Sequence, residues 1–302
     1  MKNPIFKGCG TALITPFADG AKSIDFGALE RLIDRQISDG INALIILGTT
    51  GEAATLSVAE KSEVIRFAAD RIKGRVPLVV GTGSNDTETA VANSVNAERL
   101  GAEALLVVTP YYNKCTQSGL VSHFKAVADS VGLPVIAYNV PGRTGVNILP
   151  ATFAKMCEHK NISAIKEASG NMDQISEICR LARGNAYVYS GDDGLIVPTT
   201  AVGGIGVISV ASNIAPGYFA ELAARALNGE NQKAQDMQLD ALPLIKALFS
   251  EVNPIPVKAA ARILGLAGGA LRPPLTEIEE ANLSNLKTVM RDFPPFKNAA
   301  IK

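Results

Sequence analysis

The sequence has no excess of charge of either sign and no long apolar run, and these absences exclude several classes of protein. Lys and Arg together number 29, as do Asp and Glu, so no net charge favours nucleic acid or an anionic membrane surface. No apolar stretch approaches the roughly 20 residues that a membrane-spanning helix needs. The amino terminus, Met1-Lys2-Asn3-Pro4, lacks the apolar core of a signal peptide. We therefore expect a cytoplasmic protein without nucleic-acid or membrane partners.

Side chains that bind metals or form disulfides are also few. The four cysteines form no CxxC pair and are far apart: Cys9, Cys115, Cys157 and Cys179. We expect them to be free thiols in a reducing compartment. The two histidines, His123 and His159, lie in predicted helical segments, so a histidine-based metal site is not expected. The chemistry is therefore expected to come from the protein's own side chains, without a metal or bound cofactor.

Short apolar runs recur along the chain, and amphipathic segments separate them. The eight runs cover residues 10–14, 43–47, 76–80, 104–108, 134–138, 162–165, 187–189 and 205–208. Continuous apolarity, as opposed to strict alternation, is typical of parallel strands that are covered on both faces.

The segments between these runs have helical patterns. Residues 25–39 place five apolar side chains on one stripe before Gly40, and Ser57 and Glu60 have the spacing of a capping box. Further helices are predicted at residues 86–100, 117–131, 150–158, 171–183, 194–201 and 216–228. Eight strand–helix units predict an α/β protein with a (β/α)8 TIM barrel. No Gly-rich GxGxxG follows the first strand, which argues against a dinucleotide-binding fold.

The strands stop after Gly229. Residues 232–251, 255–266 and 276–292 have helical patterns, and Pro-containing segments separate them. We therefore predict two domains, a catalytic barrel at residues 1–229 and a small helical domain at residues 230–302.

A lysine stands at the end of the sixth predicted strand. Lys166 follows the apolar run 162–165 and precedes Glu167-Ala168-Ser169-Gly170. At the mouth of a buried strand a lysine loses hydration, which disfavours its ammonium form and makes a nucleophilic amine available near neutral pH. Such an amine can form a Schiff base with a ketone. The alternative is a solvated lysine at a strand end.

Other reactive side chains follow neighbouring strands, and the active sites of such barrels form at the carboxyl ends of the strands. Thr49 and Thr50, in Gly48-Thr49-Thr50-Gly51-Glu52, offer hydroxyl and amide donors that can hold a carboxylate. Tyr138 ends the fifth strand and could transfer protons, and Arg143 could clamp a second carboxylate. Alternatively, the two threonines lie in an ordinary polar loop, Tyr138 is a packed aromatic side chain, and Arg143 forms a salt bridge within its loop.

Two tyrosines follow the fourth strand. Tyr111 and Tyr112 come directly after Pro110, which predicts a rigid loop that presents one ring inward and one outward. Interface packing is the alternative, and both interpretations can hold together. We expect all these side chains at the same face of one barrel.

Taken together, these segments resemble the 4-hydroxy-tetrahydrodipicolinate (dihydrodipicolinate) synthases, within the pyruvate-dependent Schiff-base aldolases. The matching motifs lie at residues 48–52, 138–145, 165–168, 191–193, 206–209 and 253–258. The resemblance runs in order along residues 5 to 290 with spacing like that of the family.

The resemblance implies a lyase that condenses pyruvate with L-aspartate 4-semialdehyde in lysine and diaminopimelate synthesis. In that family's pattern Lys166 forms the Schiff base with pyruvate and Thr50 holds the pyruvate carboxylate. Arg143 meets the carboxylate of the aldehyde. Gly191 and Ile208 line the pocket.

The resemblance also implies a proton relay and an assembly. Thr49, Tyr138 and Tyr112 form the relay, with Tyr112 reaching into the active site of a neighbouring subunit. Members of the family are usually homotetramers built as a dimer of dimers, with the tyrosine pair at the tight interface.

Two alternatives stay open at this point. N-acetylneuraminate lyase and the 2-keto-3-deoxy sugar acid aldolases share the barrel, the lysine and the tyrosine, but typically lack the arginine found here as Arg143. A catalytically silent sensor would be expected to have lost Lys166, Tyr138 or Thr49, and all three are present.

A regulatory cavity of the family differs in this chain. In lysine-inhibited members, a histidine follows the threonine loop and a glutamate comes from the helix after the third strand. Here the corresponding stretch, residues 56–61, contains no histidine and ends in Lys61, and Thr89 stands at the glutamate position. Ala54 is a further candidate residue of this regulatory or interface region. Asn85 and Tyr111 are retained. We therefore expect feedback inhibition by lysine to be weak or absent.

Overall fold

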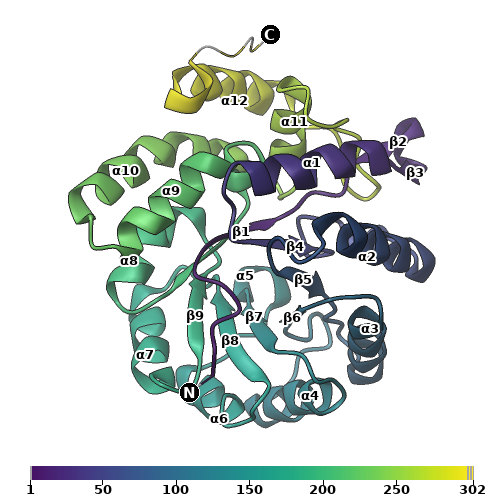
Figure 1. Cartoon of the computed structure of the whole chain (residues 1–302), viewed down its shortest axis with the longest axis vertical. Coiled ribbons are helices and arrows are strands. Elements are labelled where there is room, and N and C mark those ends of the chain that lie inside the picture. Colours follow the sequence, from purple (N-terminus) through teal and green to yellow (C-terminus); the bar gives the residue numbers. More distant parts are fainter. Residues whose placement is uncertain (1, 298, 300, 302) are drawn as a thin grey trace.

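The computed structural model describes residues 2–297, 299 and 301, and its centre is a closed barrel of eight parallel strands (Figure 1). The strands follow one another around the barrel in chain order, and the last pairs with the first. They are β1 (Gly8–Ala12), β4 (Ala43–Ile46), β5 (Leu78–Gly81), β6 (Ala104–Val108), β7 (Val135–Asn139), β8 (Ile162–Glu167), β9 (Tyr187–Ser190) and β10 (Gly206–Ser209). The prediction of a (β/α)8 TIM barrel is confirmed.

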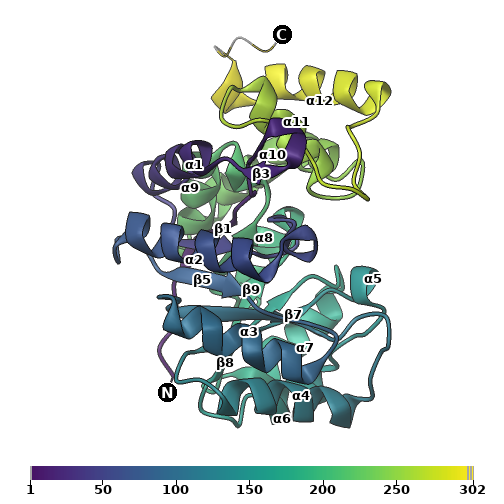
Figure 2. The same cartoon turned by 90° about the vertical axis from the view of Figure 1, so that its right-hand side faces the viewer.

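A helix follows each barrel strand and covers its outer face (Figures 1 and 2). These helices are α1 (Phe26–Ser38), α2 (Val58–Ile72), α3 (Thr87–Arg99), α4 (Gln117–Asp129), α6 (Pro150–Met156), α7 (Met172–Ala182), α8 (Ile196–Ala201) and α9 (Pro216–Leu227). The predicted capping box is present at the start of α2: the Ser57 hydroxyl accepts the Glu60 amide, and the Ser57 amide donates to Glu60 Oε2 at 2.8 Å.

The barrel has two apolar layers, as expected for strands buried on both faces. The outer layer joins the strands to the helices, and includes Leu29, Leu32 and Ile33 on the buried stripe of α1. The inner layer fills the barrel and includes Ala12, Ile45, Leu106, Ile136, Tyr138, Tyr189 and Ile208. Because the interior is packed, a ligand can enter only at an end of the barrel.

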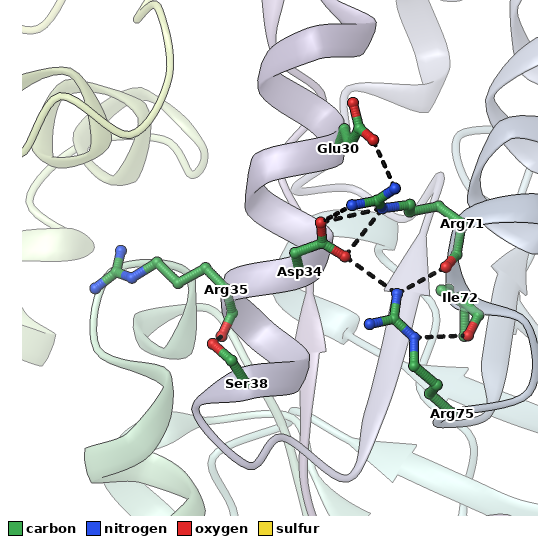
Figure 3. Close-up of polar contacts among 7 residues, drawn as sticks. All are labelled: Glu30, Asp34, Arg35, Ser38, Arg71, Ile72 and Arg75. Carbon is green, nitrogen blue, oxygen red and sulfur yellow. Dashed lines mark hydrogen bonds and ion pairs between the residues drawn. The ribbon is translucent and has the colours of Figure 1, made fainter.

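Helices α1 and α2 are also joined on the surface by ion pairs (Figure 3). The guanidinium of Arg71 contacts Asp34 and lies 2.7 Å from Glu30 Oε1, and Arg75 lies 3.1 Å from Asp34 Oδ1. The hydrogen bond from Arg71 is the largest cause that holds the pKa of Asp34 below its usual value, and the hydrogen bond from Arg75 adds to it. Exposed pairs of this kind contribute little free energy, so the buried stripe of α1 supplies most of the attachment.

In the described part of the chain, three α-helices and a short 3-10 helix, η5 (Pro294–Phe296), follow the barrel. The α-helices are α10 (Asn231–Leu248), α11 (Ile255–Ile263) and α12 (Glu280–Asp292). Helix α10 packs on α8 and α9, whereas α11 and α12 form the end of the molecule that lies farthest from the N-terminus (Figures 1 and 2). The helical character of this part is as expected. Its division from the barrel at residues 229 and 230 as a separate domain stays a prediction.

The structure differs from the sequence prediction in local details. A short hairpin, β2 (Phe17–Ala18) with β3 (Ser23–Ile24), was not predicted, because each strand has only two residues and shows no periodicity. A four-residue helix, α5 (Pro141–Thr144), occupies the loop after β7. His159 lies beyond the end of α6, so its predicted helical placement is wrong. No helix among the described residues is both long and apolar enough to cross a membrane.

Candidate active site

A cavity of about 350 Å³ opens at the carboxyl end of the barrel strands. Its walls come from the loops after β4, β7, β8 and β9, and from α10 and the segment after it. The residues that line it include Thr49, Thr50, Tyr138, Arg143, Lys166, Gly191, Asp192, Lys246, Phe249 and Asn253. The structure therefore brings together six residues that the sequence analysis placed in one site: Thr49, Thr50, Tyr138, Arg143, Lys166 and Gly191.

Lys166 is the buried amine of this cavity. Lys166 is the fifth residue of β8 and is only 5% exposed. In the sheet register it lies opposite Tyr138 of β7 and Tyr189 of β9. Burial lowers the pKa of the Lys166 amine to about 8, and the positive charge of Arg143 acts in the same direction, whereas Asp193 opposes them. About a tenth of the amine is therefore neutral at pH 7, far more than for a lysine with an ordinary pKa.

Tyr138 is the nearest aromatic neighbour of that amine. The Lys166 Nζ lies 4.4 Å from the centroid of the Tyr138 ring. Burial raises the pKa of the Tyr138 phenol to about 12, against the smaller opposing effects of Arg143 and a hydrogen bond with the Thr49 side chain. The phenol therefore stays protonated at neutral pH, and it can donate a proton and recover it through a hydrogen-bonded partner.

Gly191 leaves room for the lysine. A Cβ at this position would lie 2.7 Å from the Ala168 Cβ and 3.1 Å from the Lys166 Cε. Any other residue would therefore push against the side chain of Lys166. Ile208, which the sequence analysis also assigned to the pocket wall, is fully buried in the inner layer of the barrel and is not among the residues that line the cavity.

Asp193 is a buried carboxyl group in the matched motif at residues 191–193, and the sequence pattern predicted no role for it. One carboxylate oxygen, Oδ2, accepts the amides of Val210 and Ala211 at 2.9 and 3.0 Å. The other, Oδ1, has no hydrogen-bond partner within the described part of the chain. Burial raises the pKa of Asp193, and its charge favours the ammonium form of Lys166. The charge of Asp193 therefore limits how far burial lowers the pKa of Lys166.

Asn253 connects the two predicted carboxylate-binding residues. Its Nδ2 donates to the Thr50 Oγ1 at 2.9 Å, and its backbone carbonyl accepts from Arg143 Nη2 at 3.2 Å. Asn253 begins the matched motif at residues 253–258, but the sequence pattern predicted no role for it. The sequence pattern identified site residues by their position at the end of a predicted strand, whereas Asn253 lies between α10 and α11.

A second cavity, of about 380 Å³, adjoins the first. It shares Thr49, Tyr138, Arg143 and Asn253 with the active-site cavity, and it is also lined by Ala54, Lys61, Thr89 and Tyr111. Burial lowers the pKa of Lys61. Asn85 is not among the lining residues; its backbone carbonyl accepts from Asn113 Nδ2 at 2.9 Å.

Tyr112 stands apart from the predicted site in the single chain. The residue is 91% exposed and lines neither cavity, and its backbone has φ +70°, a conformation that is uncommon for a residue other than glycine. Tyr111, its neighbour, is 39% exposed. The two rings therefore point to different surroundings, and the predicted relay role of Tyr112 needs a second subunit.

Comparison with known proteins agrees with this arrangement along the whole chain. A sequence model of the Dihydrodipicolinate synthetase family matches residues 5–292. The chain belongs to this family. It is 52% identical over 290 residues to the 4-hydroxy-tetrahydrodipicolinate synthase of Caldicellulosiruptor saccharolyticus, covering 96% of this chain and 98% of that protein.

Solved structures of the family have the same fold. The dihydrodipicolinate synthase from Aquifex aeolicus is 44% identical with a TM-score of 0.93, covering 95% of this chain and 98% of that one. The synthase from Acinetobacter baumannii, solved as a complex with pyruvate, is 40% identical with a TM-score of 0.93, covering 95% of this chain and 98% of that one. The predicted family is confirmed, and the relatives do not favour the sister aldolases.

Proposed function

We propose that this chain condenses pyruvate with L-aspartate 4-semialdehyde to give 4-hydroxy-tetrahydrodipicolinate, the first committed step of lysine and diaminopimelate synthesis. The observation that carries the proposal is the buried Lys166 amine at the carboxyl end of the barrel, 4.4 Å from the Tyr138 ring. A pKa of about 8 makes this amine a nucleophile under physiological conditions. Full-length relatives that carry the name of this activity support the assignment.

The first half-reaction takes place at Lys166. Its free amine attacks the ketone carbon of pyruvate. The ketone oxygen takes one hydrogen from the amine and one proton from Tyr138 and leaves as water, so a protonated Schiff base remains. The Tyr138 phenolate then takes a proton from the pyruvate methyl group, which gives an enamine and restores the phenol. Thr50 holds the pyruvate carboxylate through its hydroxyl, and the absence of a side chain at Gly191 leaves room for the adduct.

The second half-reaction forms the carbon–carbon bond. The enamine carbon attacks the aldehyde of L-aspartate 4-semialdehyde, and the aldehyde oxygen takes a proton from Tyr138, whose phenol is protonated at neutral pH. Arg143, on the cavity wall, meets the carboxylate of this substrate. The substrate amine then adds to the Schiff-base carbon, closes the ring and displaces Lys166. The catalytic cycle returns the lysine as a free amine.

Thr49 and Tyr112 complete the proposed proton relay. Thr49 hydrogen-bonds with Tyr138, and Tyr112 is exposed in one chain and reaches the relay of a neighbouring subunit.

The proposed assembly is a homotetramer built as a dimer of dimers, with Tyr111 and Tyr112 at the tight interface. Ile208 supports the pocket from the inner layer. The four free cysteines agree with a cytoplasmic enzyme.

The decisive experiment is reduction of the Schiff base with borohydride in the presence of pyruvate. Peptide mass mapping is expected to place the reduced adduct on the peptide that contains Lys166. Lys258 is an internal control, because it is also fully buried but is ion-paired with Glu52. An adduct on any peptide other than that of Lys166 would falsify the mechanism. A product assay with L-aspartate 4-semialdehyde then separates the synthase from its sister aldolases.

A further inference from the structure

Asn253 joins the last part of the chain to both cavities at the carboxyl end of the barrel. The residue is 5% exposed and lines both of them. Its side-chain Nδ2 donates to Thr50 Oγ1 at 2.9 Å, although the two residues are 203 positions apart in the sequence. Its backbone carbonyl accepts from Arg143 Nη2 at 3.2 Å. Asn253 therefore contacts two groups on the cavity wall through two different parts of the same residue.

The direction of the hydrogen bond to Thr50 has a chemical consequence. A threonine hydroxyl has one hydrogen to donate and lone pairs that accept. When Asn253 donates to Thr50 Oγ1, the hydrogen of Thr50 stays free for an acceptor in the cavity. A carboxylate can only accept hydrogen bonds. Because Thr50 is itself only 3% exposed, bulk water does not compete strongly for this hydroxyl.

We propose that Asn253 is a positioning residue that holds the Thr50 hydroxyl as a hydrogen-bond donor to the pyruvate carboxylate. The inference rests on the proposed function. It extends that function by making substrate binding depend on the segment between α10 and α11. The residue acts through Thr50 and does not touch the reacting atoms.

The side chain of Asn253 can be altered without removing its other contact. The bond to Arg143 uses the backbone carbonyl, so substitutions at position 253 leave its acceptor in place. The side-chain Oδ1 has no hydrogen-bond partner within the described residues, so the bond to Thr50 is the contact that a substitution removes. The expected signature is therefore a change in the use of pyruvate with little change in the use of the aldehyde.

Steady-state kinetics of Asn253→Ala and Asn253→Asp test this signature in the full-length enzyme. Loss of one hydrogen bond in Asn253→Ala should raise the KM for pyruvate about tenfold, with the aldehyde KM and kcat changed less than about threefold. The nearly isosteric Asn253→Asp should raise the pyruvate KM further. Its carboxylate would accept the Thr50 hydrogen and repel the substrate. An unchanged pyruvate KM in both variants, or equal changes for the two substrates, would overturn the inference.

Asn282→Ala is the matched control for loosening of the same segment. Its Nδ2 donates to Glu251 Oε1 at 2.8 Å, so it holds the chain two residues before Asn253 without contacting Thr50. This variant should leave the pyruvate KM unchanged. A rise equal to that of Asn253→Ala would show that general loosening explains the effect.

A double-mutant cycle with Thr50→Val decides whether Asn253 acts through Thr50. In the Thr50→Val background, Asn253→Ala should change the half-saturating pyruvate concentration for borohydride trapping by less than about twofold. Fully additive effects would reject the positioning role. If the unmodified enzyme forms no adduct at Lys166, the proposed function fails and the inference fails with it. An adduct with unchanged half-saturation in the variants rejects only the inference.

Discussion

Lys166 and Tyr138 lie opposite each other on adjacent parallel strands, with the lysine Nζ 4.4 Å from the tyrosine ring centroid. The same burial moves their pKa values in opposite directions, to about 8 for the amine and about 12 for the phenol. Burial disfavours the charged form of each group, and the charged forms are the ammonium and the phenolate. The pair therefore presents an amine that is partly neutral near pH 7 beside a neutral proton donor.

The rate of Schiff-base formation should depend on pH through Lys166. Its amine reacts only when deprotonated, so the rate should rise about tenfold per pH unit below pH 8 and level off above it. Stopped-flow measurement of adduct formation with pyruvate between pH 6 and 9.5 checks this dependence. A rate that stays constant over that range would show that loss of a proton from Lys166 does not control the reaction.

Tyr138→Phe should slow turnover much more than it weakens pyruvate binding. Removal of a proton-transfer group should lower kcat by about 100-fold or more, whereas the pyruvate KM should change by less than about threefold. Borohydride trapping gives an independent measure of pyruvate binding and should be near normal at equilibrium. A large loss of pyruvate affinity with unchanged kcat would refute the proton-transfer role.

Arg143→Ala should chiefly impair use of L-aspartate 4-semialdehyde. Loss of the guanidinium should raise the KM for the aldehyde by about 10-fold to 100-fold. Arg143→Lys keeps the charge but not the fork of donors, so it should restore only part of the loss. Initial rates with each substrate varied in turn make the comparison. An unchanged aldehyde KM and rate in Arg143→Ala would contradict the assignment.

Lys258→Met should strongly destabilise the fold. The Lys258 ammonium is fully buried and lies 2.6 Å from Glu52 Oε1 and 3.0 Å from the Thr15 carbonyl. The substitution leaves the Glu52 carboxylate buried without its cation, which should lower the free energy of unfolding by about 3–5 kcal/mol.

Urea unfolding of three variants measures this effect. Lys258→Met combined with Glu52→Gln removes both charges and should recover part of the lost stability. Lys233→Met, at an exposed ion pair with Glu230, is the control and should change stability by less than about 1 kcal/mol. Equal stability of Lys258→Met and the unmodified protein would show that the buried pair is not needed.

Lysine should inhibit this enzyme weakly or not at all. The second cavity contains the side chain of Lys61 and has Thr89 where a carboxylate is expected in inhibited relatives. Glu52 also lines it, but its carboxylate is already bonded to Lys258 and to the Arg272 amide. Initial rates with millimolar lysine should therefore stay within about twofold of the uninhibited rate. Strong inhibition of the unmodified protein by lysine would contradict this prediction. If the missing carboxylate at position 89 is the cause, Thr89→Glu should make the enzyme more sensitive to lysine.

Local patterns were enough to predict the barrel and most of its site. Continuous apolar runs mark strands that are buried on both faces, and the residues that end them must meet at one edge of a parallel barrel. Lys166 and Tyr138 could therefore be assigned to the same cavity. Tyr112 could not be placed in this way, because it is exposed and lines neither of the two cavities described above.

By itself, the sequence determined the order of the strands, the family and the residues at the strand ends, because hydrophobic periodicity and motif spacing are local properties. Only the tertiary structure decided that Asn253 donates to Thr50 and that Lys258 neutralises Glu52, in pairs 203 and 206 positions apart. It also decided the pKa of Lys166, which depends on burial and on charges from other loops. Such contacts arise from the packing of the last helices on the mouth of the barrel, and no local pattern encodes them.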